Sequence, residues 1–105
     1  MDKYNKLNLD EVFFKLLVEG TFFINGRGVV ACGRVSSGEI SHDSDVIITD
    51  ESGYIIRYTR VSTIDYGFIS KSPIPKSAKK DWNVGLLLKE ITLEEINRGN
   101  YIVIE

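Results

Sequence analysis

Residues 26–34 read GRGVVACGR, and a second turn signal, SSGEI, follows close behind. The spacing of Gly26, Gly28 and Ala31 matches the G-x-G-x-x-A form of the dinucleotide-binding fingerprint, with Asp50 near the expected downstream distance. That fingerprint works only where a helix follows, because the helix N-terminus supplies the amide donors for the pyrophosphate. Here the glycines lead into VVACGRV and then into the next turn, which leaves no room for a helix. The stretch therefore predicts a β-strand, with Gly26 and Gly28 supplying positive φ or a close backbone approach, and no cofactor site.

The sequence on either side of this stretch is also typical of β-structure. Short runs of β-branched and aromatic residues alternate with turn signals, and the runs are TFFI, GVVACGRV, DVIIT, GYIIRYTRV, VGLLL and YIVIE. Strands at such short intervals predict an all-β fold, either a small barrel or a sandwich. One short helical turn is expected near the C-terminus, where Thr92 begins TLEEINRG, Glu95 reaches back to it and Gly99 ends it.

The N-terminal residues are open to two interpretations. Asn8 and Glu11 resemble a helix N-cap with its reciprocal partner, and an apolar stripe over residues 9–17 has helical spacing. The same residues, VFF followed by LLV, also suit a strand that is buried on both faces. Periodicity alone favours the helix.

Composition indicates one ordinary soluble domain. The chain has 105 residues, of which 43% are hydrophobic and 27% charged. A single cysteine, Cys32, excludes an internal disulfide, and a reducing, cytoplasmic setting is the simplest expectation. The polar N-terminus lacks the apolar segment of a signal peptide, and no apolar run is long enough to span a membrane.

Catalytic and metal-binding patterns are missing from the sequence. His42 is the only histidine and lies in a turn beside Asp43, where neighbouring side chains usually point apart. Cys32 lies mid-strand with no histidine nearby and is expected to be a small core residue. We therefore expect no catalytic residue, no cofactor, no metal site and no enzymatic activity.

Two separated segments carry a resemblance to a known family. TFFINGRGVVACGRVSSGEI and NVGLLLKEITLEEINRGNYIVIE resemble the opening and the closing segments of domain 2 of the translational GTPases, most closely elongation factor Tu. The resemblance implies a small closed antiparallel β-barrel over residues 13–105, preceded by an N-terminal extension, residues 1–12. It also implies that residues 14–19 form the first barrel strand rather than a helix. A Walker loop is absent, so the chain is not expected to bind or hydrolyse GTP.

In elongation factor Tu, domain 2 helps to hold the aminoacylated 3′ end of tRNA. Two of the family's positions there carry over, the glutamate before the glycine turn onto Glu19 and the asparagine of the asparagine–valine–glycine motif onto Asn83. Three other positions differ. The family has an acid where this sequence has Gly20, a glutamate where it has Ser62, and an arginine where it has Asp65. Glu19 and Asn83 therefore have two interpretations, as contacts to an aminoacylated end or as strand-end structure.

Charge is unevenly distributed along the chain. Residues 57–80 hold six basic residues and one acid, a local net charge of +5, whereas the remainder holds seven basic and fourteen acidic residues, or −7. Pro73 and Pro75 predict that residues 66–82 form a long loop. Lysines beside aromatic residues are typical of single-stranded nucleic-acid binding. The candidate binding residues are Glu19, Arg57, Arg60, Lys71, Lys76, Lys79, Lys80, Trp82 and Asn83.

Three interpretations of the 66–82 segment therefore remain. It binds tRNA or ribosomal RNA, or it binds a protein, or it is a solvated loop whose Trp82 folds back onto the barrel. A protein partner would require an exposed apolar patch, for which Phe22, Phe23, Tyr54 and Tyr58 are candidates. The expected function is that of a non-enzymatic binding module, with a protein–protein adaptor as the alternative.

Overall fold

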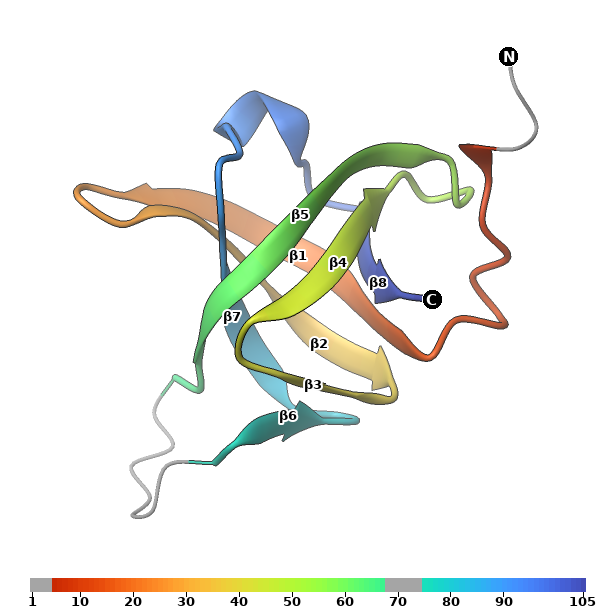
Figure 1. Ribbon diagram of the computed structural model, residues 1–105, viewed down its shortest axis with the longest axis horizontal. Coiled ribbons are helices and arrows are strands. Elements are labelled where there is room, and N and C mark those ends of the chain that lie inside the picture. The colour runs from red at the N-terminus through yellow and green to blue at the C-terminus, as the bar shows by residue number, and fades with distance from the viewer. Residues whose placement is uncertain (1–4, 68–74) are drawn as a thin grey trace.

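The structure, a computed structural model, describes residues 5–67 and 75–105. Six strands close into an antiparallel barrel in the order β1-β2-β7-β5-β4-β8, and β3 pairs with β6 in a separate two-stranded sheet (Figure 1). The all-β, closed-barrel prediction is confirmed. The strands are β1 (Phe14–Ile24), β2 (Gly28–Ser37), β3 (Glu39–Ser41), β4 (Ser44–Thr49), β5 (Ile55–Asp65), β6 (Ser77–Lys79), β7 (Asn83–Leu88) and β8 (Tyr101–Ile104).

The N-terminal helix predicted from periodicity is wrong, and the strand implied by the family resemblance is present. β1 begins at Phe14, pairs with β8 from Phe14↔Ile104 and with β2 from Lys15↔Ser37. Both edges of its first half are therefore hydrogen-bonded, and closure of the barrel overrides the helical spacing. Asn8 and Glu11 form a turn instead, in which the Glu11 N–H donates to the Asn8 carbonyl over 3.0 Å.

The glycine-rich stretch forms the β1–β2 hairpin, as predicted. Gly26 has φ +80° and Gly28 has φ +129°, values that L-residues rarely adopt. Gly33 serves a different purpose, because a Cβ at that position would collide with the Leu17 carbonyl oxygen on β1. No helix follows these glycines, so the dinucleotide-binding interpretation has no structural basis.

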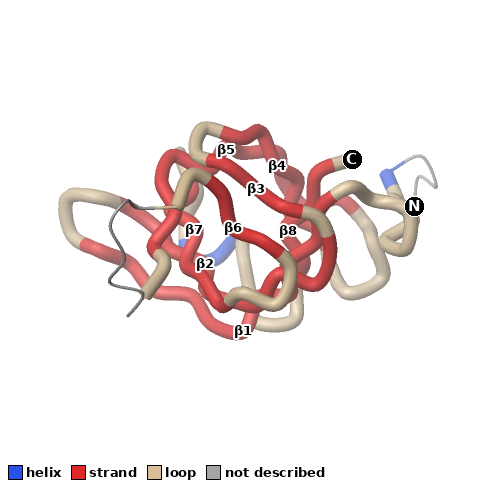
Figure 2. The backbone as a smooth tube through the Cα atoms, turned by 90° about the horizontal axis from the view of Figure 1, so that it is seen from below, coloured by secondary structure: helices blue, strands red, loops and turns tan. Residues whose placement is uncertain are grey.

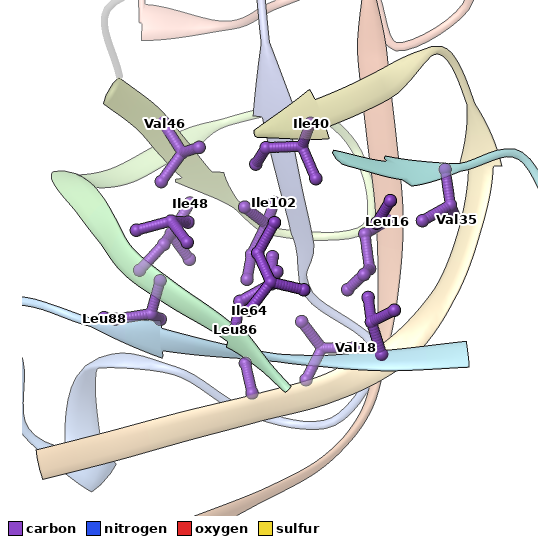
Figure 3. Close-up of a cluster of buried hydrophobic side chains, with 14 of the residues drawn as sticks. Leu16, Val18, Val35, Ile40, Val46, Ile48, Ile64, Leu86, Leu88 and Ile102 are labelled. Carbon is purple, nitrogen blue, oxygen red and sulfur yellow. The ribbon is translucent and has the colours of Figure 1, made fainter. Parts of the chain in front are cut away.

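The barrel interior is filled by alternate side chains of every strand. Figure 3 shows branched aliphatic side chains from opposite walls pointing toward one another. Ile40 of β3 and Ala78 of β6 belong to the same core, with 2% and 0% of their surfaces exposed. The β3–β6 sheet thus lies across one end of the barrel and closes it (Figure 2).

The prediction that residues 66–82 form one long loop needs correction. Part of that segment, Ser77–Lys79, is strand β6, which pairs antiparallel with β3 through Ile40↔Ala78. A three-residue strand has too short a pattern to be recognised in the sequence, and its partner β3 is equally short. Lys71 and Phe68, both within the predicted loop, lie outside the described residues.

The predicted helical turn is present as one turn of 3-10 helix, η2 (Leu93–Glu95). The Glu95 carboxylate accepts a hydrogen bond from the Thr92 N–H over 2.9 Å, which is the reciprocal contact expected from the sequence. The turn ends sooner than predicted, because Ile96 is already extended and Gly99 lies in the following turn. Within the described residues, no helix has the length and apolar character needed to cross a membrane.

Candidate functional site

A row of outward-facing residues crosses four strands near the end of the barrel that β3 and β6 close. The register places Gly20 of β1 opposite Cys32 of β2, Cys32 opposite Gly85 of β7, and Gly85 opposite Asp65 of β5. The two glycines have no side chains, so the barrel wall is depressed along this row. A Cβ at Gly85 would lie 3.5 Å from the Cys32 sulfur, which shows how closely the row is packed.

This depression is an open cavity of about 610 Å³, which we call the rim cavity. Carboxylates from two strands and one side-chain amide face it, and a buried tyrosine closes one side. Its lining residues are Glu19, Cys32, Gly33, Asp65, Tyr66, Gly67, Asn83, Val84 and Gly85.

Glu19, which lines the rim cavity, is the extra residue of a β-bulge. Val18 pairs with Gly33 and Gly20 pairs with Cys32, so Glu19 has no partner on β2. A bulge redirects the side chain at a strand position and breaks the alternation of inward and outward residues. Glu19 is exposed and lines the cavity, and the bulge places the next residue, Gly20, in the outward-facing position opposite Cys32.

Asn83 and Asp65 enter the cavity from the ends of their strands. Asn83 is the first residue of β7 and is exposed. Asp65 is the last residue of β5, and its Oδ1 atom accepts a hydrogen bond from the Gly67 N–H over 2.9 Å, which holds the carboxylate in place. Asp65 and Glu19 make the cavity acidic, and none of its described lining residues is basic.

Tyr66, buried with 7% of its surface exposed, supports the cavity from behind. Its ring packs edge-on against Trp82, with centroids 6.1 Å apart, and its hydroxyl lies 3.4 Å from His42 Nε2. Burial raises the pKa of the Tyr66 phenol. Trp82 is itself half-buried against the core, so it folds back onto the barrel and helps to position Tyr66.

The half-buried Cys32 thiol lies on the cavity floor rather than in the barrel core. Burial raises its pKa, and the nearby Asp65 carboxylate raises it further. Both effects favour the neutral thiol over the nucleophilic thiolate. Nowhere in the described part of the chain do three or more His, Cys, Asp or Glu side chains gather as a metal ion would require.

The basic residues among the predicted binding residues fall into two separate groups. Lys76, Lys79 and Lys80 are exposed around β6 and the turn that leads from it into β7. The Trp82 N–H donates to the Lys79 carbonyl over 3.1 Å, so this turn ends immediately before Asn83. The turn therefore leads directly into the cavity residue Asn83, but none of the three lysines is among the residues that line the cavity.

Arg57 and Arg60 lie elsewhere on β5, Arg57 near its start and Arg60 at its middle. Eight residues separate Arg57 from Asp65, a distance of roughly 25 Å along a strand. Arg60 pairs with Asp45 at 3.0 Å and Arg57 pairs with Glu95, so acidic neighbours balance both guanidinium groups. The structure thus brings Glu19 and Asn83 to one cavity, and neither the lysines of β6 and the β6–β7 turn nor the two arginines are among the residues that line it.

Sequence reasoning missed Asp65, Tyr66 and Cys32 as cavity residues. The sequence signal that could have found them is limited to the glycines at positions 20 and 85, which leave the barrel wall depressed. A search with this sequence found no family model that matches it.

Proposed function

We propose that this barrel is a non-enzymatic RNA-binding module of the translation-factor domain 2 type, which holds a single-stranded end at the rim cavity. One observation carries the proposal. Glu19 and Asn83, the two positions that match the family's tRNA-contacting residues, come from β1 and β7 and line one cavity. Lys79 and Lys80, both exposed, shortly precede Asn83 in the chain.

The charges suggest which parts of a nucleotide would contact the acidic cavity and which would contact the lysines. The carboxylates of Glu19 and Asp65 repel phosphate, but they accept hydrogen bonds from ribose hydroxyls and exocyclic amines. The Asn83 amide both donates and accepts, and therefore suits a base edge or a ribose hydroxyl. Phosphates would lie over Lys76, Lys79 and Lys80, outside the cavity, where their binding releases counterions.

The direct test is an NMR titration of ¹⁵N-labelled protein with total tRNA, repeated at several salt concentrations. We expect shifts at residues 19–20, 32–33 and 65–67 and at 79–85, and we expect them to fade steeply as salt rises. Replacing both Lys79 and Lys80 by alanine should reduce the slope of log K against log salt by about 1.4 to 1.8. Lys89→Ala, an exposed lysine at the start of the segment leading to η2, is the matched control and should leave the slope unchanged.

The cavity residues should behave differently from the lysines. Asn83→Ala and Glu19→Gln should weaken binding while the salt slope stays the same, because neither side chain contacts phosphate in this arrangement. No shift at low salt, or a slope that ignores the lysine substitutions, would reject the RNA-binding proposal.

A protein–protein adaptor is the second candidate, and one observation favours it. Ile56 and Tyr58 lie on the outer face of β5 with 43% and 66% of their surfaces exposed. Phe22 and Phe23 are exposed as well, whereas Tyr54 is half-buried beneath Lys6, whose Nζ lies 5.2 Å from the ring centroid. An adaptor acting through β5 would bind with little dependence on salt and would lose affinity in Tyr58→Ser, a substitution that should not affect RNA binding.

A further inference from the structure

The turn of the β1–β2 hairpin carries the dipeptide Asn25-Gly26. The Arg27 N–H donates to the Ile24 carbonyl over 2.9 Å, so Asn25 and Gly26 are the two central residues of a β-turn. Gly26 has φ +80°, whereas Asn25 lies outside the left-handed region, a combination typical of a type II turn. The turn lies at the tip of the hairpin, which extends past the rest of the barrel (Figure 1).

The reactive groups of this dipeptide are accessible and are not held by hydrogen bonds. Residues 25–27 are all exposed. Within the described part of the chain, the Asn25 side-chain amide has no hydrogen-bond partner, and the Gly26 N–H takes no part in the turn or in the strand pairing. Gly26 has no Cβ, and the space where one would stand is open to 4 Å, so its peptide nitrogen is not shielded.

The other asparagines of the chain are held by hydrogen bonds or are followed by larger residues. The Asn8 side chain donates from Nδ2 to Glu11 Oε1 and accepts the Asp10 N–H at Oδ1, both over 3.0 Å. Asn100 is buried, and its Oδ1 atom accepts the Asn97 N–H over 2.8 Å. The residues that follow Asn5, Asn8, Asn83, Asn97 and Asn100 are Lys6, Leu9, Val84, Arg98 and Tyr101, all of which have side chains that hinder approach to the peptide nitrogen.

We propose that Asn25 is a modification site, at which the chain deamidates without an enzyme. Hydroxide removes the proton of the Gly26 peptide N–H, and the nitrogen attacks Cγ of the Asn25 side chain. A bond forms between Gly26 N and Asn25 Cγ, the bond between Cγ and Nδ2 breaks, and Nδ2 takes a proton from water and leaves as ammonia. The product is a five-membered cyclic imide, and the hydroxide is regenerated.

Water then opens the imide in one of two ways. Cleavage between Gly26 N and Cγ leaves an aspartate at position 25. Cleavage between Gly26 N and the backbone carbonyl carbon of residue 25 leaves an isoaspartate, in which the chain continues through Cγ. Each conversion consumes one water and releases one ammonia, and nothing is oxidised or reduced. The rate should rise with pH, because the attacking nitrogen must be deprotonated.

Both products change the tip of the hairpin. They place a carboxylate two residues from Arg27, whose Nη2 atom donates to Thr63 Oγ1 over 3.2 Å. The isoaspartate also adds one methylene to the backbone between Ile24 and Arg27, so the turn hydrogen bond between these residues cannot keep its geometry. The modification thus adds one negative charge and loosens the turn, while the core is unaffected because residues 25–27 are not part of it.

Mass spectrometry of the chain during incubation in mildly alkaline buffer tests the site. A second sample is unfolded in guanidinium chloride, and the time in which half of its Asn25 reacts sets the time scale. Within ten such periods we expect the folded chain to gain one mass unit at Asn25. Peptide mapping should show at least tenfold less conversion at each of the other five asparagines. Enzymatic methylation of isoaspartate should detect the second product in the same peptide.

Asn25→Gln is the matched control, because glutamine keeps the side-chain amide but would have to close a six-membered ring, which forms far more slowly. This variant should show no mass gain at position 25 over the same period. Asn97→Gln changes another exposed asparagine and should leave the conversion of Asn25 unchanged. An Asn25 that stays intact in the folded chain throughout, equal conversion at another asparagine, or the same mass gain in Asn25→Gln would each overturn the proposal.

Discussion

Arg57 on β5 donates one guanidinium N–H to the Glu95 carboxylate and another, over 2.9 Å, to the backbone carbonyl of Glu90. The two acceptors belong to the segment that runs from β7 through η2, so one side chain fixes that segment to the barrel wall. The same Glu95 carboxylate also accepts the Thr92 N–H. Arg57, predicted as an RNA-binding residue from its charge, thus has a structural role in this protein.

The Glu95 carboxyl should titrate at lower pH than an ordinary glutamate. The Thr92 backbone N–H lowers its pKa most, and the hydrogen bond from Arg57 lowers it further. Because the pKa is lower in the folded state, the carboxylate stabilises the fold above the ordinary glutamate pKa of about 4.3. This contribution is lost as the pH falls through the folded-state value.

Arg57→Ala should raise the Glu95 pKa without restoring it to the ordinary value, since the Thr92 contact remains. Carboxyl ¹³C titration by NMR measures the change directly. Arg60→Ala is the matched control, because Arg60 pairs with Asp45 and should leave Glu95 unaffected. An unchanged Glu95 titration in Arg57→Ala would contradict the ion pair.

Gly33→Ala should destabilise the barrel by about 1–3 kcal/mol, because its Cβ would overlap the Leu17 carbonyl oxygen and force the β1–β2 pair apart. Gly20→Ala, on the neighbouring strand β1, is the matched control. A Cβ at Gly20 meets nothing within 4 Å, so this change should be neutral or stabilising by up to about 1 kcal/mol. Urea unfolding of both variants measures the difference, and equal effects would argue against the close approach at Gly33.

Ile40→Ala should cost about 2–5 kcal/mol if the β3–β6 sheet closes the barrel as a part of its core. Ile40 has only 2% of its surface exposed. Lys79→Ala, an exposed change on the paired strand, should alter the free energy of unfolding by no more than about 0.5 kcal/mol. If Ile40→Ala cost as little as Lys79→Ala, the β3–β6 sheet would be a peripheral attachment.

Cys32 should react slowly with iodoacetamide near neutral pH, because burial and Asp65 both raise the pKa of its thiol. Asp65→Asn should lower that pKa and move the pH profile of the reaction rate toward lower pH. The profile should still lie above that of a free thiol, since burial is the larger cause. Glu19→Gln removes the other cavity carboxylate and should leave the profile unchanged, whereas an identical shift in both variants would contradict the specific effect of Asp65.

The local sequence pattern was sufficient to predict several structural elements of this protein. The glycines at 26 and 28 marked the hairpin because only glycine readily adopts their positive φ values. The run of β-favouring residues in VVACGRV marked β2, and Thr92 with Glu95 marked η2, because each of these signals acts over a few neighbouring residues.

The tertiary structure decided what local pattern left ambiguous. Residues 14–17 became strand because barrel closure supplies hydrogen-bonding partners on both edges, from β2 and β8, that no helix could use. Ser77–Lys79 became strand because β3 lies beside it at the end of the barrel.

The candidate site also depends partly on the sequence and partly on the tertiary structure. The sequence by itself determined which residues are acidic, basic or small, and the family resemblance singled out Glu19 and Asn83. Only the strand register brought Glu19, Asp65 and Asn83 to one cavity and separated Arg57 and Arg60 from the β6 lysines. Register depends on bulges and long-range pairing, and a single extra residue such as Glu19 changes which side chains share a face.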